Sequence, residues 1–363
     1  MSNELLRSNS TSRMAPLPDQ TTGEDSLLRA YLLRLMRGES LGQLESQELA
    51  EAILDDRATD SQIAATLVAL AVKGATVDEL TGMANAMRSR ATRIHATHTN
   101  FIDTAGTGSS HSKTFNVSTA AAFVVAGAGL PVAKHGNRAA TSRTGSADVL
   151  TALGVEVRVT PEVSERCLNE LGICFMFAPL YHGAAARVAT VRRELGVHTA
   201  FNLLGPLTNP AGAPCQILGV WHPSLVEPLA RTLAVLGTRR AWVVHGMDGL
   251  DEVTVADKTV VVEADDGDVR TFEIAPEDFG LKRSDLAALR GDDPEESAST
   301  IRQILEGRQR DQARDLVVIN AAAALVVGGT TDDLTAARQQ AEISIDSGAA
   351  LEKLEALTKV TNE

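Results

Sequence analysis

Residues 101–119 read FIDTAGTGSSHSKTFNVST, and the pattern of the chain changes at this stretch. It begins with a short apolar run typical of the end of a β-strand, continues with small residues, and leads into an alanine-rich segment typical of a helix. A strand, a glycine-containing turn and a helix start can aim backbone N–H groups and the positive end of the helix dipole at an anion. The stretch therefore predicts a phosphate-binding loop, with an ordinary tight turn as the alternative.

The chain after residue 101 alternates short β-branched runs with alanine-rich helical segments. This order predicts an α/β fold with a mostly parallel sheet. Residues 255–273 alternate acidic and apolar side chains, which indicates an antiparallel hairpin. The expected strands of the sheet lie at residues 131–133, 155–159, 174–177, 217–220 and 242–244.

The chain before residue 101 has helical spacing of its apolar residues. Thr59 with Gln62 and Thr76 with Glu79 form two capping boxes, each ahead of a helical run. Residues 1–23 are rich in Ser, Thr and Asn and lack the apolar core of a secretory signal. We therefore expect a disordered tail at residues 1–23, a separate all-helical domain at residues 24–95 and an α/β domain at residues 96–363.

Composition narrows the class of ligand. The 363 residues are 44% hydrophobic and 22% charged, and they contain no apolar run long enough to cross a bilayer. The net charge of −13 without a Lys/Arg cluster argues against a nucleic-acid partner, so a small-molecule ligand is expected. Cys167, Cys174 and Cys215 form no CxxC pair and are expected to be buried and reduced, which favours the cytoplasm.

Two well-known phosphate loops are excluded by the residues present. A dinucleotide GxGxxG motif needs glycine where His111 stands, and no GKS or GKT of a P-loop occurs. Further polar segments follow the expected strand at 131–133, namely KHGNR at residues 134–138 and TSRTGS at residues 141–146. Ligands of open α/β sheets lie outside the carboxyl ends of the strands. A phosphate-rich ligand is therefore favoured over solvated loops.

Two segments add charged candidates. Asp251 and Glu252 follow a β-rich run, and paired carboxylates together with phosphate oxygens suit Mg²⁺, although such a pair is also common as surface acids. Arg192 and Arg193 end a helical segment that begins near His182. A guanidinium can hold a carboxylate in bidentate fashion, and the alternative is that the pair complements the helix dipole.

Three blocks then carry a resemblance: KHGNRAATSRTGSADVLTALGV, VRRELGVHTAFNLLGPLTNPAG and GLDE, in this order after an all-helical start. The chain from about residue 25 resembles the anthranilate phosphoribosyltransferase family. The resemblance implies transfer of the phosphoribosyl group of phosphoribosyl pyrophosphate to the amine of anthranilate, with Mg²⁺, in tryptophan biosynthesis. It also implies a nucleoside phosphorylase/phosphoribosyltransferase-type architecture, in which the segment at about 182–195 joins the helical domain and residues 96–363 form the phosphoribosyl-binding domain. Family members are commonly homodimers through the helical domain.

The resemblance also implies the site, position by position. No residue is assigned as general base, and His111, His135 and His182 are candidates only for proton handling after attack. Magnesium would be bound by Ser118, Asp251 and Glu252, and anthranilate by Gly106, Asn137, His182, Arg192, Ala178 and Pro179. Phosphoribosyl pyrophosphate would be bound by Gly106, Thr107, Gly108, Ser109, Ser110, Thr114, Asn116, Ser118, Thr119, Lys134 and Ser142.

The sequence departs from the family pattern in two places. The family loop usually reads GTGGDG, whereas residues 106–111 read GTGSSH, and the residues after His182 are Gly183, Ala184 and Ala185 instead of a proline followed by bulkier residues. Three other functions stay open at this point. They are a phosphoribosyltransferase for another aromatic amine, a pyrimidine-nucleoside phosphorylase, and a non-catalytic relative that binds nucleic acid.

Overall fold

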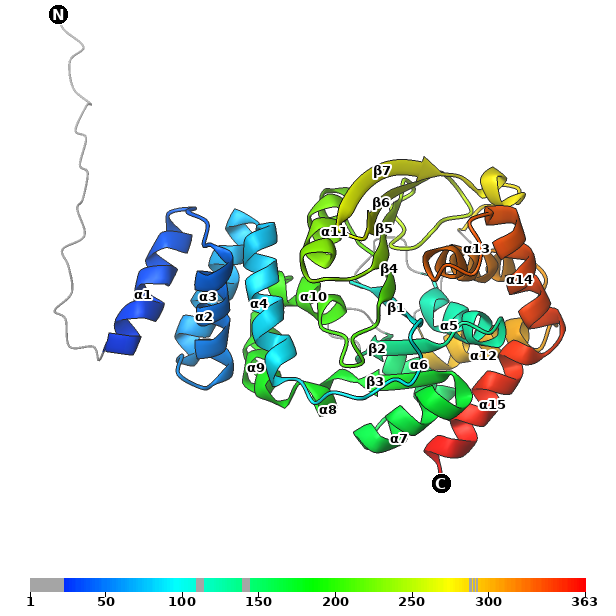
Figure 1. The fold of residues 1–363 in the computed structure, drawn as a ribbon, viewed down its shortest axis with the longest axis horizontal. Coiled ribbons are helices and arrows are strands. Elements are labelled where there is room, and N and C mark those ends of the chain that lie inside the picture. Colours follow the sequence, from blue (N-terminus) through cyan, green and yellow to red (C-terminus); the bar gives the residue numbers. More distant parts are fainter. Residues whose placement is uncertain (1–22, 109–113, 139–143, 287–288, 290, 292) are drawn as a thin grey trace, which may run out of the picture.

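The computed structural model describes residues 23–108, 114–138, 144–286, 289, 291 and 293–363, which form a helical part and a larger α/β part (Figure 1). The predicted class, α/β with a separate helical region, is confirmed. The expected tail at residues 1–23 lies almost wholly outside the described residues. Among the described helices, none combines the length and apolar character that a bilayer crossing requires.

Four helices build the first part, and their ends follow from local chemistry. The Thr59 and Thr76 side chains each accept a hydrogen bond from the backbone three residues later, so both predicted capping boxes are present. A later helix, α9 (Ala186–Leu195), packs against the second and third of these helices. The four helices are α1 (Gly23–Met36), α2 (Gln43–Leu54), α3 (Asp60–Lys73) and α4 (Val77–Arg90).

The described residues form a seven-stranded sheet with the order β3-β2-β1-β4-β5-β6-β7. The first five strands are parallel, and β6 and β7 form the antiparallel hairpin predicted from residues 255–273. The strand order reverses at β1, which lies between β2 and β4, and ligands bind at such switch points. The strands are β1 (Ile102–Gly106), β2 (Val132–Gly136), β3 (Ile173–Phe177), β4 (Cys215–Gly219), β5 (Arg240–Gly246), β6 (Thr259–Asp265) and β7 (Asp268–Ile274).

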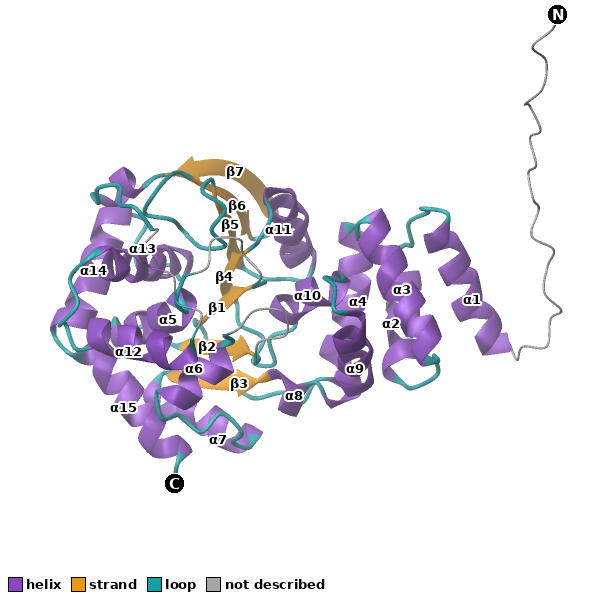
Figure 2. Ribbon diagram, turned by 180° about the vertical axis from the view of Figure 1, so that it is seen from behind, coloured by secondary structure: helices purple, strands orange, loops and turns teal. Residues whose placement is uncertain are grey.

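Helices lie on both sides of the sheet (Figure 2), and the buried hydrophobic residues form two clusters. Alternation along the strands sends Ile217 and Val244 into one cluster and Leu218 and Val243 into the other. The first cluster contains α5 (Val117–Gly127), α12 (Pro294–Leu305), α13 (Gln312–Val327), α14 (Leu334–Asp346) and α15 (Ala349–Thr361). The second runs through α10 (Ala200–Leu204) and α11 (Val226–Val235) into α1–α4, so one continuous core joins the helical part to the sheet.

The prediction of a strand at residues 155–159 is wrong. Val155 and Val157 are buried, as their alternation indicates, but this segment pairs with no strand among the described residues. The backbone N–H of Glu156 instead donates to the hydroxyl of Thr361 on α15. Alternating burial therefore reflects packing against a helix here. The remaining short helices are α6 (Ser146–Ala152), α7 (Pro161–Arg166), η1 (Cys167–Leu171), α8 (Ala178–Tyr181), η2 (Gly183–Ala185), η3 (Gly205–Leu207), η4 (Pro223–Leu225) and η5 (Pro276–Phe279).

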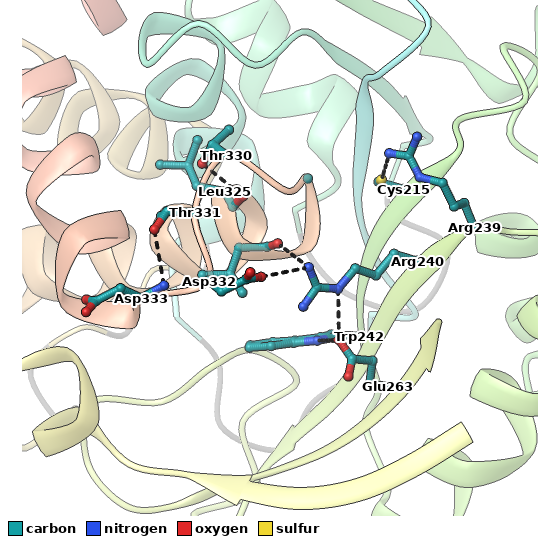
Figure 3. A network of polar contacts seen from close by, with 12 residues as sticks. Cys215, Arg239, Arg240, Trp242, Glu263, Leu325, Thr330, Thr331, Asp332 and Asp333 are labelled. Atoms are coloured by element: carbon teal, nitrogen blue, oxygen red, sulfur yellow. Dashed lines mark hydrogen bonds and ion pairs between the residues drawn. The ribbon is translucent and has the colours of Figure 1, made fainter. Parts of the chain in front are cut away.

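A polar network closes the sheet at the edge where β4 and β5 begin, far along the strands from their carboxyl ends (Figure 3). The fully buried carboxylate of Glu263 accepts hydrogen bonds from Arg240 and Trp242, each at 2.9 Å. Arg240 also donates to the Val326 carbonyl of α13 at 3.0 Å. Since each buried charge has a partner, this network ties the antiparallel strands to the helices. The three cysteines are buried and free, as predicted.

Candidate active site

The glycine-containing turn lies at the switch point of the sheet. β1 ends at Gly106, which pairs with Gly219 at the end of β4. The Thr107 N–H donates to the Gly219 carbonyl at 2.9 Å, and the Thr107 hydroxyl accepts from the Trp221 N–H at 3.3 Å. Gly108 has φ +67, which side chains other than glycine rarely adopt. The turn is therefore fixed at both of its described ends, whereas Ser109, Ser110 and His111 lie outside the described residues.

Polar side chains at the start of α5 lie next to this turn. Asn116 occupies the N-cap position of α5, although its side chain makes no capping hydrogen bond. Its backbone N–H donates to the Ser297 hydroxyl on α12 at 3.0 Å. The Thr119 hydroxyl is buried and has no hydrogen-bond partner among the described residues. The Thr114 hydroxyl donates to the Phe115 carbonyl. The α5 N-terminus and its hydroxyl groups thus lie at the carboxyl end of β1, where an anion can be bound.

Lys134 connects β2 to the same place. Its ammonium group donates to the Thr104 carbonyl, and it lies 3.4 Å from the Ser118 hydroxyl. The side chain is 4% exposed. Burial lowers the pKa of Lys134, while the carboxylates of Asp103 and Glu252 oppose this shift. A buried cation with two carboxylates nearby is electrostatically compensated.

The acid pair after β5 reaches the start of α5. The Ser118 N–H donates to the Glu252 carboxylate, and burial together with the neighbouring Asp251 raises the pKa of Glu252 to about 8. Gly219 permits this approach, because a Cβ there would lie 1.7 Å from the Asp251 carbonyl oxygen. The structure therefore brings Ser118, Lys134 and Glu252 together from three separate strand ends.

Two buried imidazoles lie on the other side of Lys134. The rings of His135 and His182 are tilted against each other, with their centroids 5.1 Å apart. The Nδ1 of His135 donates to the Gly205 carbonyl at 3.2 Å, and the Nε2 atoms of both rings are buried without a partner among the described residues. Burial lowers the pKa of His135 to about 3 and that of His182 to about 4. Both rings are neutral at pH 7.

The remaining residues predicted to bind anthranilate come from three other segments of the chain. Arg192 is on α9, and its Nε is buried without a partner among the described residues; burial lowers its pKa. Arg193 is exposed beside it, so only Arg192 has its guanidinium partly withdrawn from water. Asn137 is exposed after β2, and Ala178 and Pro179 follow β3 at the start of α8. Ser142, predicted to bind phosphate, lies outside the described residues.

Sequence reasoning missed the segment that holds the imidazoles. Besides the bond from His135 to Gly205, the backbone of Thr208 forms a hydrogen bond with His182. Asn209 donates to the buried Asp103 carboxylate at 2.7 Å, and Asp103 in turn accepts the His135 N–H at 3.2 Å. Burial raises the pKa of Asp103 to about 6. In the sequence, the signals for these contacts were the carboxylate of Asp103 and the amide of Asn209, each in mostly apolar surroundings.

The chain is similar in sequence to known protein families and to individual enzymes. Residues 98–351 match the glycosyl transferase family, a/b domain, and residues 29–91 match the glycosyl transferase family, helical bundle domain. The anthranilate phosphoribosyltransferase of Moorella thermoacetica is 52% identical over 91% of this chain and 97% of its own length. That of Desulfosudis oleivorans is 50% identical over 91% of this chain and 97% of its own length.

Solved structures give the same likeness. The chain is similar to anthranilate phosphoribosyltransferase from Thermus thermophilus, with a TM-score of 0.85 and 40% identity over 92% of this chain and 99% of that one. It is also similar to the enzyme from Saccharomyces cerevisiae in complex with PRPP and Mg, with a TM-score of 0.85 and 27% identity over 93% of this chain and 98% of that one.

Proposed function

We infer the function from membership: the chain belongs to the anthranilate phosphoribosyltransferase family, and it transfers the phosphoribosyl group of phosphoribosyl pyrophosphate to the amine of anthranilate in tryptophan biosynthesis. The products are N-(5-phosphoribosyl)anthranilate and pyrophosphate. One structural observation supports this inference most directly. Ser118, Lys134 and Glu252 lie close together at the switch point of the sheet, near two neutral imidazoles.

The phosphoribosyl pyrophosphate lies at the carboxyl ends of β1 and β2 in this proposal. Backbone donors of the turn after β1 and the α5 N-terminus face the pyrophosphate, and Lys134 supplies a buried positive charge. Donors fixed before the reaction stabilise the negative charge that develops on the leaving pyrophosphate. The proposed contacts are Gly106, Thr107, Gly108, Ser109, Ser110, Thr114, Asn116, Ser118, Thr119, Lys134 and Ser142.

Magnesium fits the donor set of this site. Asp251 and Glu252 repel each other, and the raised pKa of Glu252 reflects the cost of that proximity together with burial. Mg²⁺ usually keeps water and substrate phosphate oxygens among its ligands, so one or two protein carboxylates are enough to bind it. Ser118, Asp251 and Glu252 would hold the ion, which when bound neutralises charge on the pyrophosphate oxygens.

Anthranilate occupies the side of the imidazoles. Arg192 faces its carboxylate, since a partly buried guanidinium without a partner on Nε can accept an anionic ligand. Asn137, His182 and Gly106 line the same side, with Ala178 and Pro179 at the entrance. Holding the amine in line with the anomeric carbon is the main demand on the protein, because this amine needs no strong base. No general base is assigned.

The wider organisation follows the family. We assign residues 24–95, together with the segment at about 182–195, to a helical domain and residues 96–363 to the phosphoribosyl-binding domain. The contact of α9 with α3 supports this division. The protein is a cytoplasmic homodimer in this proposal, and the exposed Met36 and Val72 on the helices α1 and α3 support an interface there. Light scattering of the purified protein tests the dimer.

An assay with a small panel of acceptors tests the function. With anthranilate, phosphoribosyl pyrophosphate and Mg²⁺, the purified protein should consume anthranilate fluorescence and release an equal amount of pyrophosphate. Gly183 is exposed, and a Cβ there would meet no atom within 4 Å, so the altered 183–185 segment leaves room on the acceptor side. Pyrophosphate release only with another aromatic amine would move the acceptor assignment, and release with none would overturn the function.

A further inference from the structure

The loop that carries the acid pair has no regular secondary structure where it matters. β5 ends at Gly246, and residues 247–254 contain no helix or strand. Two adjacent carboxylates that repel each other tend to move apart unless the backbone beneath them is fixed. Contacts that hold the backbone of residues 251–253 therefore decide whether Glu252 stays beside Ser118.

One buried amide holds this backbone from below. The Oδ1 of Asn320 accepts the Val253 N–H at 2.9 Å, and its Nδ2 donates to the Val253 carbonyl at 2.8 Å. Both backbone groups of the residue after Glu252 are thus bound by a single side chain. The same Nδ2 donates to the Leu316 carbonyl at 2.8 Å, which fixes the amide in one orientation.

The amide comes from a helix that is buried along almost its whole length. Asn320 is 3% exposed and lies in the middle of α13, where its neighbours Ile319 and Ala321 are fully buried. A polar side chain among apolar ones costs free energy unless its hydrogen bonds are made. All the donor and acceptor capacity used here goes to the loop or to its own helix, so packing alone does not explain an asparagine at this position.

A second contact holds the loop at the end of β4. At Gly219 any Cβ would collide with the Asp251 carbonyl, so the loop rests directly on the end of β4. Residues 251–253 therefore contact both the end of β4 and α13. This arrangement leaves the Glu252 carboxylate directed at the Ser118 N–H and the Lys134 charge.

From this geometry we propose that Asn320 is a positioning residue for divalent-cation binding, acting through the Val253 backbone on Glu252. The proposal rests on the metal site of the proposed function. Groups that orient metal ligands from behind are typically worth about 10- to 100-fold in metal affinity or activity.

The test measures cation binding without turnover. Mn²⁺ is titrated into the protein with inorganic pyrophosphate, and free Mn²⁺ is followed by electron paramagnetic resonance. Asn320→Leu has a similar volume and removes every bond of the amide, and it should weaken Mn²⁺ binding about tenfold or more. Asn320→Asp keeps an acceptor for the Val253 N–H but sets a carboxylate against two carbonyls, so it should also weaken binding. It provides the same test if the leucine variant does not fold.

Asn100→Leu is the matched control. Asn100 donates to the Gly328 carbonyl at the end of the same helix, at the opposite edge of the sheet. This variant should lose comparable stability in thermal unfolding and keep wild-type Mn²⁺ affinity. In steady-state assays Asn320→Leu should raise the Mg²⁺ concentration for half-maximal activity while the KM for anthranilate stays within twofold.

Glu252→Gln separates the two possible failures. If Glu252→Gln weakens Mn²⁺ binding and both Asn320 variants bind like wild type, Asn320 is only structural and the inference is wrong. If Glu252→Gln itself keeps wild-type affinity, the proposed metal site is wrong, and the positioning role fails with it. Loss of affinity in Asn320→Leu equal to that in Asn100→Leu would also overturn the inference, since it would follow stability alone.

Discussion

The proposed site has a donor side, which binds phosphoribosyl pyrophosphate, and an acceptor side, which binds anthranilate. The two sides differ in how their polar groups are hydrogen-bonded. On the donor side, Lys134, Ser118 and Glu252 contact one another. On the acceptor side, Nε2 of His135, Nε2 of His182 and Nε of Arg192 are buried without partners among the described residues. Because an unpaired buried polar group costs free energy, the acceptor side leaves its hydrogen bonds for a ligand to make. On the donor side the Thr119 hydroxyl is likewise unpaired among the described residues, but Lys134, Ser118 and Glu252 already contact one another before a ligand binds.

The two sides also come in part from different parts of the chain. Of the donor groups, Lys134 lies on β2 and Ser118 at the start of α5, whereas Glu252 lies in the loop after β5 that Asn320 holds. Of the acceptor groups, His135 lies on β2 next to Lys134, whereas His182 ends α8 and Arg192 lies on α9, which packs against α3. Motion of the helical part relative to the sheet would therefore move Arg192 relative to His135 and leave the donor groups in place.

The largest expected effect comes from removing the acids of the donor side. The double variant Asp251→Ala/Glu252→Ala should lose roughly 10³-fold or more in kcat, since electrostatic stabilisation of the leaving group is lost. Its circular dichroism should stay near that of wild type, because both residues lie in a loop outside the helices and strands. The adjacent acids Glu295 and Glu296 at the start of α12 give the control double variant, which should keep wild-type turnover. Wild-type turnover in the first variant would remove the donor side from the chemistry.

The next effect separates the acceptor side. Arg192→Ala should cost about 2–5 kcal/mol in kcat/KM for anthranilate, because the substrate carboxylate would be left unpaired. The KM for phosphoribosyl pyrophosphate should stay within twofold. Arg193→Ala is the matched control, since Arg193 is exposed on the same helix. An equal loss for both substrates in Arg192→Ala would instead indicate a structural role in α9.

A smaller effect concerns the turn at the switch point. Gly108→Val forces a β-branched residue to φ +67, which costs about 1–2 kcal/mol of backbone strain or a moved turn. Calorimetric titration should show phosphoribosyl pyrophosphate binding weakened about tenfold or more as a result. Gly38→Val is the control, since Gly38 has φ +77 and lies in the connection after α1. Equal binding in both variants and wild type would make the turn an ordinary one.

Much of the fold was predictable because its signals are local. The Thr59 and Thr76 capping boxes and the hairpin of β6 and β7 depend on residues close in sequence, and the structure has them. The strand expected at 155–159 was wrong because its alternation matches packing against α15 equally well. The residue identities of the site came from a resemblance in sequence blocks and stay a prediction.

What the sequence could not predict depends on contacts between distant residues. Asn320 contacts Val253 across 67 positions, and Asn209 contacts Asp103 across 106. Nothing in the composition near Gly219 indicates that the Asp251 carbonyl lies against it. Each of these residues supports a site residue from behind, and only the assembled sheet brings them there.

The smallest expected effect is that of the His135 and His182 imidazoles on the pH dependence of turnover. Their pKa values lie near 3 and 4, so both rings stay neutral between about pH 6.5 and 8 and turnover should not change through their titration in this range. Their effect is on stability. Since the folded pKa of His182 lies below the ordinary value of about 6.5, the unfolded chain binds more protons as the pH falls, and the contribution present above about pH 6.5 is lost on acidification. Between about pH 7 and 5 this amounts to roughly 1–2 kcal/mol of unfolding free energy.

The contribution of His182 to stability can be separated from that of the nearby carboxyl groups by comparing two proteins that share those carboxyl groups. The raised pKa values of Asp103 and Glu252 act in the opposite direction, since stability from a buried neutral carboxyl is lost as the pH rises. Comparing the denaturant unfolding of wild type and His182→Gln at about pH 5, 6 and 7 removes these shared contributions. The advantage of wild type should shrink by about 1–2 kcal/mol from pH 7 to 5. If the difference in unfolding free energy does not change with pH, His182 is protonated equally in the folded and unfolded states. The acceptor side would then not be distinguished from the donor side by a buried imidazole whose Nε2 has no partner among the described residues.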